Sequence, residues 1–189
     1  MLKQFVTLTV FVFLIGCFSG SNGRHTEVDE HLVNVERKKG LTYVEGHLFT
    51  GELNLKNSNG DVVFSRFFKE GKLDGPYRKW YGPNQIKESR NFVNNKKEGK
   101  HLGYRSDGKL FFEFNFKDGK YTDTLKEWYS NGHLNKLEYY EDGKQVGRQK
   151  AWRKNGELYL NYDVRNGRKY GNAGIKHCKS LWNEVDTDM

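Results

Sequence analysis

Apolar and polar residues alternate along most of this chain, in short runs that turn residues interrupt at regular intervals. The same pattern returns every 24 residues from Gly51 to Gly171, with no insertion or deletion. Alternation with a period of two is typical of β-strands with one buried face, and Asn-Gly or Asp-Gly between such runs is the strongest short-range signal for a hairpin. The units begin at Gly51, Gly75, Gly99, Asp123 and Gly147, and Gly171 follows the last of them.

Each unit divides into two expected strands and two expected turns. The first strands are predicted over 52–56, 76–81, 100–105, 124–129 and 148–153, and the second over 62–68, 86–92, 110–116, 134–140 and 158–164. The turn inside a unit, such as Ser130-Asn131-Gly132, is expected to be type I′, in which both central residues have positive φ. A second turn, such as Asp142-Gly143, leads into the next unit.

A fixed period of this length indicates a repeat array, in which each unit buries its apolar face only against its neighbours. The sequence therefore predicts an all-β fold. We expect an elongated, single-layer antiparallel sheet of about five repeated 24-residue β-hairpins, with irregular end caps.

Three columns of residues across the units are candidates for the core. They are Val62, Ile86, Leu110, Leu134 and Leu158; Phe68, Phe92, Phe116, Tyr140 and Val164; and, on the partner strands, Lys56, Trp80, Tyr104, Trp128 and Trp152. The first two columns share parity, so a regular strand would point both to one side of the sheet. We expect the three columns to form one apolar stripe. The alternative is that some of these aromatic residues form a face on which a ligand stacks.

The residues flanking the repeats depart from the pattern, as the end units of an array must do to close it. Residues 32–50 are expected to form an N-terminal capping hairpin, in which 32–36 pairs with 41–44 around a turn at 38–40. Residues 171–189 are expected to form a closing cap and an acidic tail, with Ile175, Leu181 and Trp182 covering the last strand.

The N-terminus has the features of an export signal. Lys3 precedes an apolar run from Phe5 to Ile15, which is too short to span a bilayer as a helix but suits a signal-peptide core. The run ends in Leu14-Ile15-Gly16-Cys17, which resembles the bacterial lipobox and implies a lipoprotein-type signal peptide over 1–17, with Cys17 acylated. Residues 18–31 are predicted to be a flexible tether. The alternative is an ordinary secretory signal, which would leave Cys17 incidental.

Composition adds a basic bias to this picture. Of the 189 residues 35% are apolar and 30% are charged, with a net charge of +8 spread over the repeats. Such a distribution indicates a solvated surface, or an anionic partner attracted at long range. The candidate binding residues are Arg78, Lys79, Lys126, Arg148 and Lys150.

The units resemble a known family. Segments of the form Gly-x4-Trp-Tyr-x-Asn-Gly-x-Leu followed by Tyr-x2-Gly-Lys are similar to the MORN-repeat variant of bacterial proteins, often described as antitoxins. Residues 123–144 match almost position by position, with Asp123 in place of the leading glycine, and residues 147–168 match with Arg153 in place of tyrosine. The resemblance covers about two thirds of the chain. It implies a β-hairpin ribbon with a binding role, whereas an antitoxin would usually be cytosolic and the N-terminus predicts export.

No catalytic constellation emerges, so we expect a protein that is not an enzyme and needs no cofactor. The six histidines occupy non-equivalent positions, without the spacing of a metalloprotease motif. His177 and Cys178 are weak candidates for metal or redox chemistry, because two ligands do not make a metal site. Cys178 could also form an intermolecular disulfide or remain an inert thiol.

The sequence thus favours a non-catalytic, lipid-anchored protein of the bacterial cell envelope that faces an extracytoplasmic compartment and acts as a protein-binding scaffold. An alternative is binding of anionic lipid head groups or glycans by the basic and aromatic residues. Metal or redox activity through Cys178 is a further alternative. Nucleic acid is not an expected partner, because export would separate the protein from it.

Overall fold

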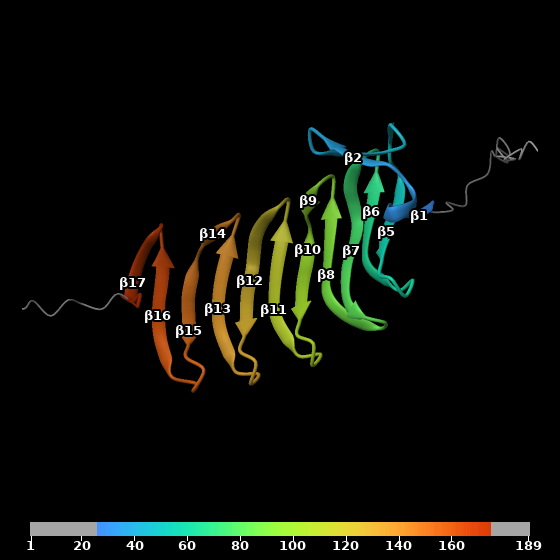
Figure 1. The fold of residues 1–189 in the computed structure, drawn as a ribbon. Helices are drawn as coiled ribbons and strands as arrows, with labels where there is room; N and C mark the ends of the chain where they lie inside the picture. Colours follow the sequence, from blue (N-terminus) through green and yellow to red (C-terminus); the bar gives the residue numbers. More distant parts are fainter. Residues whose placement is uncertain (1–25, 175–189) are drawn as a thin grey trace, which may run out of the picture.

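The computed structural model describes residues 26–174, in which one long sheet carries nearly all of the chain (Figure 1). The sheet has 14 strands, whose order from β5 (Gly51–Lys56) to β17 (Arg168–Asn172) follows the chain, with every pair in that stretch antiparallel. β9 (Lys96–Lys97) and β10 (Gly99–Tyr104) both pair with β8 (Gln85–Val93), and β14 (Lys144–Gln145) and β15 (Gly147–Trp152) both pair with β13 (Leu134–Glu141). A separate three-stranded sheet lies at its N-terminal end and consists of β2 (Val35–Lys38), β3 (Leu41–Val44) and β4 (His47–Leu48). The predicted architecture is confirmed: the fold is all-β, with a long antiparallel sheet of hairpin-like strands.

The long strands cover the predicted segments, although β7 and β12 begin four residues before the predicted starts and continue through the unit boundary. The first strands of the units are β5 (Gly51–Lys56), β7 (Lys72–Gly82), β10 (Gly99–Tyr104), β12 (Lys120–Trp128) and β15 (Gly147–Trp152). The second strands are β6 (Val62–Lys69), β8 (Gln85–Val93), β11 (Leu110–Lys117), β13 (Leu134–Glu141) and β16 (Leu158–Arg165). The short strands are β1 (Glu27–Asp29), β2 (Val35–Lys38), β3 (Leu41–Val44), β4 (His47–Leu48), β9 (Lys96–Lys97), β14 (Lys144–Gln145) and β17 (Arg168–Asn172).

The turn with two residues of positive φ is the one between units, whereas the sequence predicted it inside each unit. Inside a unit only one turn residue has positive φ, for example Gly132 at 85°, and the backbone closes through bonds from Gly132 N to Tyr129 O and from Tyr129 N to His133 O. This is the pattern of a three-residue loop with a glycine bulge, so the predicted type I′ turn was wrong at this position. The turn between units is the one with two positive φ values, as at Asp142 (49°) and Gly143 (80°).

The residues at the unit boundaries share an unusual backbone conformation. All six have positive φ: Gly51, Gly75, Gly99, Asp123, Gly147 and Gly171. Next to Gly75 and Asp123 the pairing register of the preceding strand shifts, which marks a β-bulge. Asp123 takes φ 56° although it carries a side chain. Glycine recurs in this column because a left-handed backbone disfavours a Cβ atom.

The core is a ladder of rings that runs across the strands. The rings belong to Phe64, Tyr77, Phe92, His101, Phe116, Tyr121 and Tyr140, with successive centroids 4.6 to 5.6 Å apart. We call the side of the sheet that carries these rings the ladder face and the other side the open face. Each ring packs against the next, so a single layer of strands gains a continuous apolar seam.

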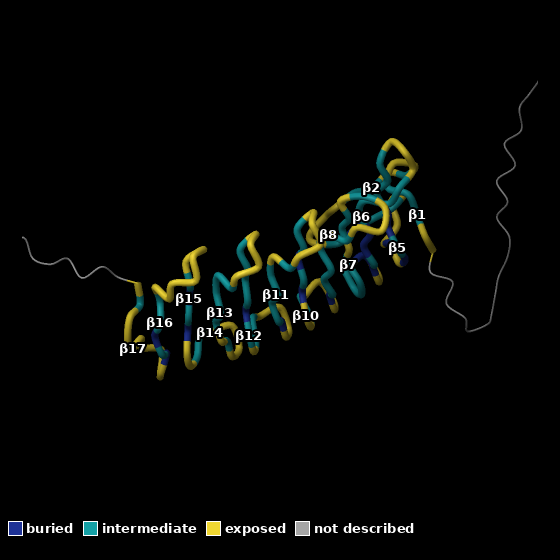
Figure 2. The backbone as a smooth tube through the Cα atoms, turned by 90° about the horizontal axis from the view of Figure 1, so that it is seen from below, coloured by how far each residue is buried: buried dark blue, intermediate teal, exposed yellow. Residues whose placement is uncertain are grey.

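The predicted core columns are only partly correct. Phe68, Phe92 and Phe116 are buried, whereas Trp80, Trp128 and Trp152 are half-buried. A register shift in each hairpin, for example between the pairs Leu55–Phe64 and Lys56–Val62, breaks the alternation on which the common stripe relied. Figure 2 shows the consequence: buried positions lie along the middle of the strands, and the turns on both rims are exposed.

The small sheet covers the ladder face at the N-terminal end. Thr42 N donates to Gly71 O (2.8 Å), and Gly71 N donates to Phe49 O (2.7 Å). Phe49, Leu53 and Phe68 form a buried cluster against which Val35 and Val44 of the small sheet pack. We call β2, β3 and β4 the cap. Its first strand begins at Val35, so the predicted strand over 32–36 began too early.

The predicted tether over 18–31 also extends too far. Residues 27–29 form β1, which pairs in parallel with β5, and a 3-10 turn (Glu30–Leu32) follows. Val28 packs against the buried cluster, and Glu27 accepts a hydrogen bond from Asn54 Nδ2 at 2.8 Å. These contacts order the segment, which the polar sequence before it gave no reason to expect. The signal segment with Cys17, and Ile175, His177, Cys178, Leu181 and Trp182 of the predicted closing cap, lie outside the described residues.

Candidate functional site

Three of the predicted binding residues lie in one row on the open face. The register pairs Arg78 with Ser89, Ser89 with Leu102, Leu102 with Glu113, Glu113 with Lys126, Lys126 with Leu137, and Leu137 with Lys150. Directly paired residues share a face of the sheet. We call Arg78, Lys126 and Lys150 the basic row. It crosses six strand intervals, which is about 29 Å at ~4.8 Å per interval.

The basic row is not uniformly positive. Glu113 lies within it, and its Oε1 is 3.7 Å from Lys126 Nζ and 3.4 Å from Lys100 Nζ. The carboxylate therefore stands between two cations, with an exposed fraction of 17%. Leu102 and Leu137 place half-buried apolar side chains in the same row. The surface thus combines both signs of charge with apolar area.

Arg148 lies two residues before Lys150 on the same strand and therefore on the same face. It pairs with Asp163, which in turn pairs with Tyr170 on the last described strand. Tyr170 and Tyr139 are 52% and 38% exposed, large values for aromatic side chains. Arg148 Nη1 is 3.3 Å from Asn161 Oδ1. Together these residues extend the basic row toward the C-terminal end.

Lys79 lies apart from the other four predicted residues. It pairs with Phe64 and Glu88 on the ladder face, with its Nζ 5.3 Å from the Phe64 ring centroid and 3.9 Å from Glu88 Oε2. Because Arg78 and Lys79 are consecutive in a strand, alternation alone puts them on opposite faces. The five residues therefore do not form one site.

Two polar side chains occupy equivalent positions in the core, where the strand is interrupted between β9 and β10 and between β14 and β15. His101 Nε2 is 2.9 Å from Asn91 O, and Gln149 Nε2 donates to Val146 O at 2.7 Å and Tyr139 O at 3.1 Å. Both side chains are buried. Burial lowers the pKa of His101, since it disfavours the charged ring. These residues satisfy backbone groups at the two interruptions, which is a structural role.

Sequence reasoning missed a cationic residue on the ladder face. Arg66 is buried beneath the cap and lies over the Phe64 ring, with Cζ 4.6 Å from the centroid. Its side chain forms an ion pair with Glu30 of the 3-10 turn. The repeat period could have identified Arg66. Arg90 and Phe114 follow it at steps of 24 residues, and the Phe114 side chain lies on the ladder face.

Two features are absent from the part of the chain that the structure describes. Across residues 26–174, no group of three His, Cys, Asp or Glu side chains is arranged to hold a metal ion. The same part of the chain contains no helix that is long and apolar enough to cross a membrane. What the surface offers instead is an extended array of charged, polar and apolar groups on the open face.

A comparison of the chain with protein-family models, with curated proteins and with solved structures finds no match.

Proposed function

We propose that this protein is a non-catalytic scaffold that binds a protein partner through the open face of its sheet. The observation that carries the proposal is the register that aligns Arg78, Lys126 and Lys150 in one row with Leu102 and Leu137 between them. Arginine and exposed tyrosine are enriched at protein interfaces, and charged groups set the orientation of the partner. The partner would present acidic groups spaced along an extended surface.

The mixed charge of the row favours a protein over a uniformly anionic partner. Glu113 lies between Lys100 and Lys126, at distances that partly neutralise both cations. A polyanionic glycan or a sheet of anionic head groups would be repelled by this carboxylate, whereas a protein surface can place a cation opposite it. The basic residues remain compatible with binding of anionic lipids or glycans, which is the second candidate.

The remaining parts of the proposal rest on the sequence. The resemblance to the MORN-repeat variant supports a binding role, and the lipobox-like segment supports a lipid anchor at Cys17 in the bacterial cell envelope. Acyl chains on Cys17 would tether the array to a membrane surface without a spanning helix. Mass spectrometry of the mature N-terminus checks this part: we expect a diacylated peptide that begins at Cys17, and an unmodified cleavage site would contradict it.

Site-specific photocrosslinking in intact cells tests the binding face. A photoreactive residue is placed at Leu102 or Leu137 on the open face and, as the control, at Lys136 on the ladder face. We expect one discrete protein adduct from the two open-face positions and none from Lys136, because neighbours in a strand point to opposite sides.

Charge reversal completes the test. Arg78→Glu, Lys126→Glu and Lys150→Glu are combined, and the matched control combines Lys39→Glu, Lys109→Glu and Lys154→Glu, which change net charge equally in exposed turns. The first combination should abolish the adduct and the second should preserve it. Equal effects, or salt-sensitive binding to anionic vesicles without any protein adduct, would reject the scaffold in favour of the second candidate.

A further inference from the structure

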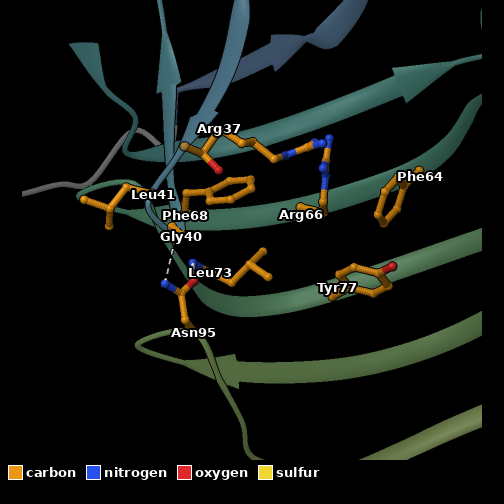
Figure 3. A pocket seen from close by; sticks show the side chains of 10 residues that line it. Arg37, Gly40, Leu41, Phe64, Arg66, Phe68, Leu73, Tyr77 and Asn95 are labelled. Carbon is orange, nitrogen blue, oxygen red and sulfur yellow. Dashed lines mark hydrogen bonds between the residues drawn. The ribbon is translucent and has the colours of Figure 1, made fainter. Parts of the chain in front are cut away.

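A pocket of about 310 Å³ lies between the cap and the ladder face (Figure 3). Its walls come from both layers: Leu41 and Thr42 from the cap, and Phe64, Phe68, Leu73 and Tyr77 from β6 and β7. The volume is at the lower end of the range found for small-molecule sites, and most of the lining is apolar. Asn95 Nδ2 donates to Gly40 O at 3.0 Å and ties the cap to the β8–β9 turn at the edge of this space.

Two arginines project into this pocket and share one carboxylate. Figure 3 shows the Arg37 and Arg66 side chains extending toward one another. Glu30 Oε1 is 3.3 Å from Arg37 Nη2, and Glu30 Oε2 pairs with Arg66 Nη2. Two cations against one anion leave this group with one unit of excess positive charge.

Arg66 has hydrogen-bonding capacity that the protein does not use. Its side chain is only 9% exposed, and its buried Nε has no hydrogen-bond partner among the described residues. An unsatisfied donor on a buried cation is costly, and Arg90 and Arg105 each have a buried Nε in the same condition. Arg66 differs from them because it lines the pocket, where the carboxylate of a ligand can approach its guanidinium. The Phe64 and Phe68 rings hold the guanidinium by cation–π contacts, with Cζ 4.6 Å and 5.8 Å from their centroids.

From this arrangement we infer that the pocket binds a small organic carboxylate with an apolar or aromatic body. The carboxylate accepts hydrogen bonds from Arg66 and Arg37, and the apolar body packs among Phe68, Leu73 and Tyr77. Guanidinium groups suit carboxylates because their donors match the two oxygens. The ligand could be a free acid or the C-terminal residue of a peptide, since both present the same chemistry.

The repeat supplies a matched control. Arg90 lies 24 residues after Arg66 and also stacks on a ring, with Cζ 5.5 Å from the Tyr77 centroid. It pairs with Glu88 of its own strand, at 2.8 Å, and it does not line the pocket. Arg66→Gln and Arg90→Gln therefore remove the same group from the same repeat position, with and without contact to the pocket.

Isothermal titration of the full protein with phenylacetate tests the inference, with phenylacetamide as the neutral isostere. We expect binding of the acid only, a loss of about 10-fold or more in affinity for Arg66→Gln, and a change of less than about twofold for Arg90→Gln. N-acetylphenylalanine distinguishes the sources: tighter binding than phenylacetate assigns the site to a peptide C-terminus, and weaker binding assigns it to a free acid.

Two further variants separate the inference from a folding defect. Glu30→Gln removes the competing carboxylate and should strengthen phenylacetate binding several-fold, a gain that misfolding cannot produce. Leu41→Trp should fill the space from the cap and abolish binding while leaving the arginines in place. No heat of binding for phenylacetate, equal binding of phenylacetamide, or equal losses for Arg66→Gln and Arg90→Gln would overturn the inference.

Discussion

The capped N-terminal end and the uncovered C-terminal repeats share a sequence period but differ in how they bury their residues. At the capped end, Leu53 is fully buried in a cluster with Phe49 and Phe68, and the cap packs against that cluster. In the later repeats the core is a single layer of rings. Leu125, which occupies the repeat position of Leu53, is 6% exposed there. The repeat sets the backbone path, and the second layer adds a closed apolar cluster and the pocket that Arg66 lines.

Truncation of Leu53 and of Leu125 should give the largest change in stability. The two residues can be compared directly because they occupy the same repeat position three units apart. Truncation of a fully buried leucine leaves a cavity, so Leu53→Ala should cost about 3–4 kcal/mol of unfolding free energy. Leu125→Ala should cost about 2 kcal/mol, because the single layer can relax around the smaller side chain. Urea denaturation measures both. Equal costs would mean that the cap adds nothing to the core.

Gly71 and Gly119 give the next largest effect. Both are left-handed turn residues, with φ 76° and 82°. A Cβ atom on Gly71 would lie 2.8 Å from Leu48 Cδ2 and 2.9 Å from Thr42 O, whereas on Gly119 the nearest atom would be Lys96 Cβ at 3.7 Å. Gly119→Ala should cost about 1–2 kcal/mol from backbone strain alone. Gly71→Ala should cost about 1 kcal/mol more, because it also forces the cap away.

Thermal denaturation of these two variants would show the difference as a gap in Tm. If the two glycine variants melted at the same temperature, the close contact between the cap and the first inter-unit turn would be contradicted.

His101 should make the stability of the array depend on pH, and Gln149 supplies the comparison. The folded-state pKa of His101 lies below its ordinary value of 6.5 because burial disfavours the charged ring. The unfolded chain therefore binds the proton more tightly, and stability should fall as pH drops below 6.5 toward the lowered pKa of the folded state. His101→Gln should remove this part of the pH dependence, since Gln149 fulfils the same role without titrating.

Stability measured from pH 7.5 to pH 5 in both forms checks the point. An unchanged pH slope in His101→Gln would show that other groups are responsible.

Asp123→Gly should give the smallest effect, and in the opposite direction. Asp123 holds φ 56° where the other boundary positions have glycine. Removing its side chain should relieve strain and stabilise the protein by about 0.5–1 kcal/mol. Part of this gain is offset because glycine makes the unfolded chain more flexible. Gly147→Asp, at the equivalent position one unit later, is the reciprocal control and should destabilise. A loss of stability in Asp123→Gly would indicate that its carboxylate has a role of its own.

The sequence predicts the strands and turn positions well because both depend on local patterns. The 24-residue spacing of turn residues, including the boundary column from Gly51 to Gly171, located every long strand. The errors came where contacts between distant residues decide the structure. Register shifts inside the hairpins broke the common stripe of Trp80 and Phe92, and pairing of residues 27–29 with β5 ordered part of the predicted tether.

The candidate sites show the same division. Alternation could already separate Arg78 from Lys79, and the 24-residue period explains why Lys126 and Lys150 fall in one row. The pocket could not be predicted, because it depends on the cap folding over β6 and β7 and on Glu30 reaching Arg66 across 36 residues. No local pattern encodes that contact.

Native-state hydrogen exchange of the full protein, read peptide by peptide, tests the central claim most directly: the cap concentrates stability at one end of a uniform repeat. We predict the slowest exchange in β5, β6 and β7, with protection falling through the later repeats to β16 and β17. Uniform protection along the array, or slower exchange in β15 and β16 than in β5 and β6, would contradict it.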